Sequence, residues 1–323
     1  MAKARAIVKR RKAVRNIKKI TKTMQMIATA KFQKSLKRAV GTKPYTMKVR
    51  ELVQELAASV GAVEHPLLRR PDAQSSTNRI AVIVITSNRG LAGAYNGNVL
   101  RMANRFFREQ EAAGKTIDLY IAGKKGISYF NFQKRAITSR LDALDVPKYA
   151  DIEQLASMLM QQFIEGKVDS VSVAYMNFIS TGVQKADVLT LLPLAGLQEV
   201  ADHIGRQVAE KESQAQAGAL DATRAANARA EHVLHGETIY DFSPDARSLL
   251  DELLPLTVNT ALFQTFLDAT TSEHVARMVA MKSATDNADK MQKALTMEYN
   301  RARQSQITTE LSEIMGGVEA MKS

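Results

Sequence analysis

The segment from Ser87 to Gly97 (SNRGLAGAYNG) is the part of the chain most similar to a phosphate-binding loop. It follows a β-rich run and places Gly90, Gly93 and Gly97 just before a predicted helix, where backbone N–H groups can bind phosphate. The spacing is GxxGxxxG, which matches neither GxGxxG nor GxxxxGK followed by Ser or Thr. We therefore favour a tight strand-to-helix turn that needs small residues over a nucleotide site.

Other residue types give little support for catalysis or metal binding. The sequence has no Cys, which excludes disulfides, thiolate nucleophiles and Cys-based zinc or iron–sulfur sites. His232 and His235 stand three residues apart on a predicted helix, but exposed surface histidines are favoured over a metal site. No Ser/His/Asp grouping or close carboxylate pair stands in a suitable loop. We expect no catalytic residue, no cofactor and no metal on this chain.

The first fifty residues are strongly basic. They carry 17 Lys and Arg and no Asp or Glu, whereas the other residues carry 28 of the 45 basic residues and all 33 acidic ones. Such asymmetry indicates a segment that faces a polyanion or an acidic partner. Apolar residues in this segment recur at steps of three and four, which predicts one apolar stripe on a helix. The stripe consists of Val14, Ile17, Ile20, Met24, Ile27 and Ala30.

Two interpretations of this basic helix stay open at this point. One is a basic coiled-coil nucleic-acid-binding protein, in which Lys and Arg follow the phosphates. Phe32 and Tyr45 are the only aromatic residues available for base stacking in this segment, although duplex phosphate binding needs none. The other is a basic shaft among acidic protein surfaces, where the charges orient the helix and guide its association with the partner.

The middle of the chain has the pattern of an α/β domain. Helix-like stretches near residues 98–113 and 151–166 alternate with β-rich runs, which predicts a parallel or mixed sheet covered by helices. We expect a Rossmann-like α/β domain over residues 77–196. The β-rich runs are Arg79–Thr86, Ile117–Ala122, Val168–Tyr175 and Val188–Pro193.

The remaining chain is predicted to be helical. Residues 197–238 are rich in Ala, Gln, Glu and Arg and read as a polar, helical insertion, and residues 243–323 read as a long C-terminal helix. Apolar residues at steps of three and four predict a packing seam along this C-terminal helix. After a shift of one residue in the repeat, the seam is expected to continue at Ile307, Leu311 and Ile314. The main part of that seam is Met278, Met281, Ala284, Ala288, Met291, Leu295, Tyr299 and Ala302.

Length decides between two arrangements of these helices. Helix from Pro255 to Ile314 would extend roughly 90 Å, whereas a compact chain of this size has a radius of gyration of about 20 Å. The C-terminal helix must therefore protrude and needs a partner, which the N-terminal helix over residues 1–62 offers. We expect an antiparallel coiled coil of the N- and C-terminal helices with the α/β domain inserted between them. The alternative is a helical bundle folded back on the sheet.

Three segments strongly resemble the gamma subunit of F-type ATP synthases. They are the turn SNRGLAGAYNG, KRRKAVRNIKKITKTMQMIATAKF from Lys9 to Phe32, and RMVAMKSATDNADKMQKALTMEYNRARQSQITTELSEIMGG from Arg277 to Gly317. The resemblance covers most of the chain except roughly residues 199–235. It implies a non-catalytic central rotor of a proton-translocating synthase, a coiled coil inside a ring of alpha and beta subunits.

The resemblance also implies partners, a location and contact residues. The partners are the alpha and beta subunits, the epsilon subunit and the membrane c-ring, without nucleic acid or direct membrane insertion. The location is the cytoplasmic face of the inner (plasma) membrane, as a peripheral part of the synthase. Met24 in KTMQM, Arg277 in RMVAM, and Arg303 with Gln304 in YNRARQ match the family's contacts to beta subunits. The alternative is that these residues make no contact with a beta subunit. Met24 would then be buried in the seam of the coiled coil, and Arg303 and Gln304 would lie on the solvated surface of the helix.

Overall fold

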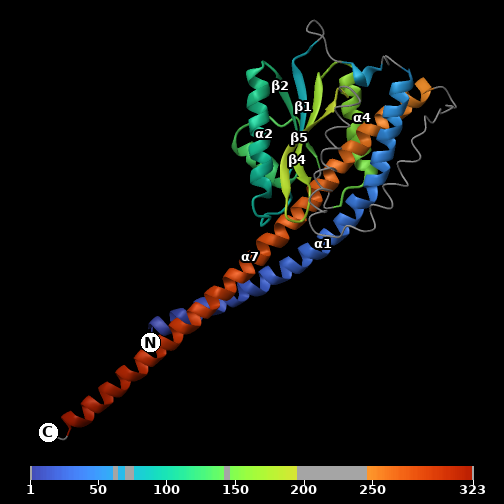
Figure 1. Cartoon of the computed structure of the whole chain (residues 1–323). Coiled ribbons are helices and arrows are strands. Elements are labelled where there is room, and N and C mark those ends of the chain that lie inside the picture. Colours follow the sequence, from blue (N-terminus) through green and yellow to red (C-terminus); the bar gives the residue numbers. More distant parts are fainter. Residues whose placement is uncertain (1, 61–64, 70–75, 142–145, 195–245, 322–323) are drawn as a thin grey trace, which may run out of the picture. The chain divides into compact units, whose positions relative to one another are not determined.

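The computed structural model describes residues 2–60, 65–69, 76–141, 146–194 and 246–321 (Figure 1). The expected insertion over residues 197–238, with His232 and His235, lies outside the described residues. The chain forms two compact units. The first holds the chain up to Phe32, Leu91–Gly93 and the chain from His274, and the second holds Gln33–Gly90 and Ala94–Glu273.

The second unit contains a five-stranded mixed sheet in the order β3-β2-β1-β4-β5. Strand β1 pairs in parallel with β2 and β4, β2 pairs in parallel with β3, and β5 is antiparallel to β4. The order of the four parallel strands is that of a Rossmann-like fold, which confirms the predicted fold class. The strands are β1 (Arg79–Ile85), β2 (Thr116–Ala122), β3 (Ser139–Leu141), β4 (Ser170–Phe178) and β5 (Gln184–Leu192).

Helices cover the sheet, and its central strands are almost wholly buried. In β1 every residue after Arg79 is buried, which is why this strand reads as an unbroken apolar run. The short strand β3 and the helix α3 were not predicted from the sequence. The helices of this unit are α2 (Tyr95–Ala112), α3 (Lys124–Phe132) and α4 (Tyr149–Ile164), with the short 3-10 helix η1 (Pro66–Leu68).

Two long helices run through both units. Helix α1 spans Ala2–Val60, and helix α7 spans Ala246–Ala320 with Pro255 inside it. In the second unit, buried residues of α7 such as Leu254, Leu262 and Phe266 join Phe163 of α4 in the core of the sheet domain. Within the described residues, no helix combines the length and the apolar character that a membrane crossing requires.

In the first unit, α1 and α7 pack side by side through a narrow seam (Figure 1). Ile7 and Val14 of α1 pack with Ala288 and Leu295 of α7. The predicted α1 stripe is partly wrong, because its three isoleucines lie at the surface. Ile17, Ile20 and Ile27 are 51%, 59% and 52% exposed, whereas the buried positions recur every seven residues at Ile7, Val14, Thr21 and Ala28.

We predict that Gly123→Ala severely destabilises the sheet domain. Gly123 has φ +101°, and a Cβ there would lie 2.2 Å from the Thr86 carbonyl oxygen, so the loop after β2 would have to move. The expected loss is about 3 kcal/mol or more. The measurement is urea unfolding of the full-length chain. Gly97→Ala is the control, because a Cβ there meets nothing within 4 Å, and it should be neutral or stabilising by up to about 1 kcal/mol. Equal losses in both variants would contradict this account.

Asp169 predicts a pH dependence of stability. Its carboxylate accepts hydrogen bonds from Ser76 Oγ at 2.5 Å, and from the Thr77 backbone N–H and Oγ1 at 2.9 Å each. Partial burial favours a higher pKa, but these hydrogen bonds outweigh it and hold the pKa of Asp169 below its usual value. The stabilisation is therefore complete above the unfolded-state pKa of about 3.9 and is lost as the pH falls through the lower folded-state pKa.

We expect Asp169→Asn to lower the free energy of unfolding at pH 7 by about 1 kcal/mol. The difference from wild type should vanish at acidic pH, as measured by urea unfolding from pH 7 down to pH 2. Glu153→Gln on the exposed surface of α4 is the control and should leave the pH profile unchanged. A loss of equal size at every pH would show that the charge of Asp169 is not responsible.

Candidate functional site: the helix pair and its exposed faces

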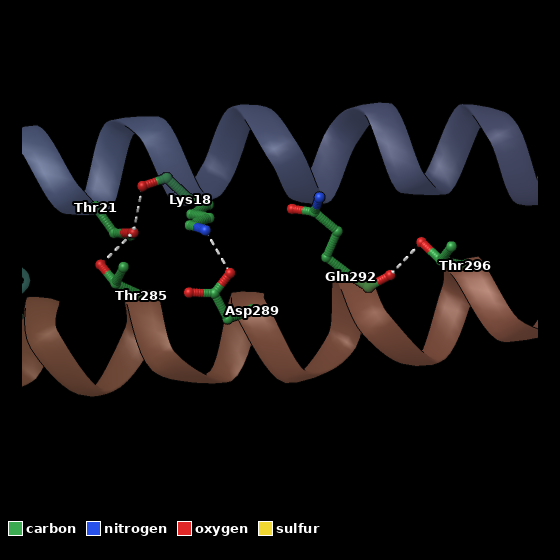
Figure 2. A network of polar contacts seen from close by, with 6 residues as sticks. All are labelled: Lys18, Thr21, Thr285, Asp289, Gln292 and Thr296. Carbon is green, nitrogen blue, oxygen red and sulfur yellow. Dashed lines mark hydrogen bonds and ion pairs between the residues drawn. The ribbon is translucent and has the colours of Figure 1, made fainter.

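A buried hydroxyl pair joins the two helices at the middle of the seam (Figure 2). The Thr285 hydroxyl lies 2.9 Å from Thr21 Oγ1, and Thr21 in turn donates to the Lys18 carbonyl oxygen at 3.1 Å. Only 9% of Thr21 and 6% of Thr285 are exposed. The Met281 carbonyl oxygen, 2.8 Å away, is an alternative acceptor for the Thr285 proton. The pair thus satisfies two buried hydroxyl groups inside a mainly apolar seam.

Charged groups of α1 flank this hydroxyl pair. Lys18 forms an ion pair with Asp289 of α7 beside the two threonines (Figure 2). Further towards the amino end of α1, the Arg11 guanidinium lies 5.0 Å from the centre of the Tyr299 ring, in cation–π contact. From Thr21 to Lys18 to Arg11 the residue numbers on α1 decrease, while those of their partners on α7 increase from 285 to 289 to 299. The two helices are therefore antiparallel, as predicted.

The second unit contains a similar hydroxyl pair between the same two helices. Ser35 Oγ lies 2.6 Å from Thr271 Oγ1, and both side chains are buried. The neighbouring Ser272 donates to the Met176 carbonyl oxygen at 3.3 Å, which connects α7 to strand β4. Small hydroxyl side chains therefore bring α7 close to both α1 and the sheet within this unit.

The four predicted contact residues lie far apart along the helices. Met24 on α1 is half-buried, and Arg277 on α7 is only 8% exposed and has partners within the structure. Arg303 and Gln304 are exposed on α7, roughly 40 Å further along the helix axis than Arg277. The Gln304 backbone carbonyl oxygen accepts from Thr308 Oγ1 at 3.0 Å. The structure does not bring these residues into one site.

Exposed apolar residues on both helices are functional candidates that the sequence analysis assigned to the seam. On α7, the expected continuation at Ile307, Leu311 and Ile314 is wrong, because these residues are 44%, 55% and 64% exposed. Like the isoleucines of α1, they are large apolar side chains that the helix pair leaves exposed. The signal that could have separated seam from surface is the seven-residue repeat of small or hydroxyl residues at Thr21 and Ala28.

Hydrogen bonds hold the glycine-containing turn and link it to the start of α3. The Ser87 backbone N–H donates to Asn96 Oδ1 at 3.0 Å, and the Lys124 N–H donates to Asn88 Oδ1 at 3.2 Å. Gly93 has φ +55°, and a Cβ there would lie 3.7 Å from Ala280 Cβ on α7. The Asn96 side chain thus bonds back to Ser87 at the start of the turn, which favours the tight-turn interpretation. Among the described residues, no group of three or more His, Asp or Glu could hold a metal ion.

Comparisons with known proteins agree with this architecture. Solved structures share the fold: the Euglena gracilis mitochondrial ATP synthase (OSCP/F1/c-ring) contains a chain with a TM-score of 0.59 at 18% identity, covering 99% of this chain and 95% of that one. A chain of the Tetrahymena thermophila mitochondrial ATP synthase central stalk and c-ring has a TM-score of 0.53 at 18% identity. The match covers 82% of this chain and 99% of that one. At this level of identity the likeness concerns the fold.

Sequence comparisons extend over the whole chain. The sequence profile of a family described as ATP synthase matches residues 3–321. The ATP synthase gamma chain of Rhodopirellula baltica is 41% identical over 323 residues and that of Leptospira biflexa is 37% identical over 322, covering 100% and 99% of this chain and 100% of each relative. The chain therefore belongs to the ATP synthase gamma chain family.

Proposed function

We propose that this chain is the central-stalk subunit of a rotary, proton-translocating ATP synthase. In this role it transmits rotation of a membrane c-ring to the nucleotide sites of the beta subunits. The observation that carries the proposal is the antiparallel helix pair, which has an internally satisfied seam and apolar residues on its outer surface. The full-length similarity to gamma chains supports it.

The proposed partners follow from the surfaces of the two units. A ring of alternating alpha and beta subunits would cover the exposed apolar residues of the helix pair, and the basic side chains of α1 would orient it among acidic groups. The sheet domain would meet the epsilon subunit and the c-ring. The complex would hold this chain as a peripheral subunit at the cytoplasmic face of the membrane.

We assign no catalytic group to this chain. Its effect on the beta subunits is mechanical: an asymmetric shaft changes the nucleotide affinity of a beta subunit only if it contacts the different beta conformations unequally. A shaft that interacted equally with all of them would shift no equilibrium. The irregular distribution of apolar and basic residues over α1 and α7 supplies the required asymmetry.

Reconstitution tests this proposal. We expect the full-length chain alone to show no ATP turnover, and to join purified alpha and beta subunits in a stoichiometric complex that hydrolyses ATP. Turnover by the chain alone, abolished by Gly90→Ala, would contradict the absence of a catalytic site. Failure to join the ring, with nucleic acid recovered instead, would favour the alternative function.

Within this proposal, Arg303 and Gln304 are the strongest candidates for contact with a beta subunit, because both side chains are exposed. Met24 and Arg277 are proposed as further contacts. We expect Arg303→Ala with Gln304→Ala to reduce turnover of the assembled complex roughly ten-fold, which corresponds to about 1.4 kcal/mol. Assembly should persist, because the seam residues are unchanged.

The matched control is Arg101→Ala with Asn98→Ala, which removes an exposed arginine and amide that bond to each other on α2. This control should leave ATP turnover within two-fold of wild type. Normal turnover in a correctly assembled Arg303/Gln304 variant would mean that these side chains are solvated surface.

A further inference from the structure

Helix α1 carries two faces that could each pack against α7. The buried face is Ile7, Val14, Thr21 and Ala28, which are 4%, 8%, 9% and 2% exposed. The second face contains Ile17, Ile20 and Ile27, each more than half exposed, and lies roughly 100° around the helix from the first. The exposed face is the more apolar of the two.

Hydrophobic burial alone therefore does not explain which face is inside. Turning α1 by this angle would bury three isoleucines in place of the face of Ile7, Val14, Thr21 and Ala28, so a larger apolar side chain would replace the threonine and the alanine, which burial of apolar surface favours. The observed orientation must gain from interactions that the turned helix would lose. Polar contacts are suitable, because they depend on direction whereas apolar packing does not.

Two neighbouring polar contacts depend on the observed orientation. The Thr285 hydroxyl meets Thr21 Oγ1 at 2.9 Å, and Lys18 meets Asp289 one helical turn away (Figure 2). Turning α1 would separate both pairs and leave the Thr285 hydroxyl against isoleucine side chains. The Thr285 hydroxyl would keep the Met281 carbonyl oxygen as an acceptor, so what the turned arrangement loses is the contact between the two hydroxyls and the Lys18–Asp289 ion pair.

The small size of the buried face completes the argument. Ala28 of α1 and Ala288 of α7 are buried in the same helix pair. Alanine and threonine allow the helix axes to lie close enough for hydroxyl groups to meet, which larger isoleucines would prevent. Close packing and hydroxyl pairing thus support the same orientation.

We infer that Thr21, Thr285, Lys18 and Asp289 are positioning residues that set the rotational orientation of α1 against α7 and so keep the face of Ile17, Ile20 and Ile27 at the surface. A buried polar pair of this kind specifies one arrangement among several, at some cost in stability. The inference concerns the helix pair of the chain itself and does not depend on the proposed function.

Thiol accessibility tests the inference, because the natural chain has no Cys. Ile27→Cys and Ala28→Cys, in separate full-length chains, place the reporter at neighbouring positions that are 52% and 2% exposed. With the native threonines, we expect the reporter at position 27 to react with a maleimide at least ten-fold faster than the reporter at position 28. In the turned arrangement this preference would disappear or reverse.

Three backgrounds isolate the role of the hydroxyl pair. Thr21→Val with Thr285→Val removes both hydroxyls, and Thr21→Ser with Thr285→Ser restores them. The matched control is Thr29→Val with Thr296→Val, whose hydroxyls bond to the carbonyl oxygens of Gln25 and Gln292 on their own helices. All four threonines are in α1 or α7 of the first unit.

We expect the reactivity ratio to fall at least five-fold in the Thr21/Thr285 valine background and to stay high in the serine background and in the control. Helical circular dichroism and thermal stability should be unchanged or higher in the valine background, because valine matches threonine in shape and helix propensity. An unchanged ratio would overturn the inference. Loss of helical structure in the valine background would also overturn it, because the pair would then be needed for folding itself.

Discussion

The packing of α1 against α7 decides which side chains the helix pair presents to a partner. Around Thr21, Ala28 and Thr285 its seam is built from small or hydroxylated residues, whereas Ile7, Val14 and Leu295 make it apolar further along. A seam of this kind contributes less hydrophobic stabilisation than one of leucines and isoleucines. Directional contacts instead determine which faces of α1 and α7 pack against each other. Larger apolar side chains such as Ile20 therefore stay at the surface.

The helix pair accounts for part of the charge distribution of α1. Lys18 and Arg11 interact with Asp289 and Tyr299 of α7, so part of the basic character belongs to the helix pair itself. These contacts are partly solvated, and each contributes little stability by itself. The basic residues are therefore better explained by orientation within an acidic environment than by folding. Positive charge on a shaft suits a partner whose facing surfaces are acidic, without a requirement for nucleic acid.

The sequence was sufficient to predict the class of the fold and the antiparallel pairing, because strand-length apolar runs such as Ile80–Ile85 and long three-and-four repeats are strong signals. It was not sufficient to assign the inner face of α1. Ile17 and Ile27 satisfy the same periodicity as the true seam, and periodicity does not distinguish an apolar face that packs within the chain from one that awaits a partner. The helix α3 was missed because its nine residues are shorter than a reliable helical pattern. The contact roles of Arg303 and Gln304 came from resemblance alone and remain proposals.

A covalent lock across the seam tests most directly whether the helix pair acts through its outer faces while its inner contacts only hold it together. Thr21 and Thr285 have hydroxyl oxygens 2.9 Å apart, and the chain has no other Cys to interfere, so Thr21→Cys with Thr285→Cys should form a disulfide under oxidation. ATP turnover of the assembled complex should then be the same, within two-fold, in the oxidised and reduced forms. A large loss of turnover on oxidation that reduction restores would show that α1 and α7 must slide or separate during the cycle, and would contradict this account.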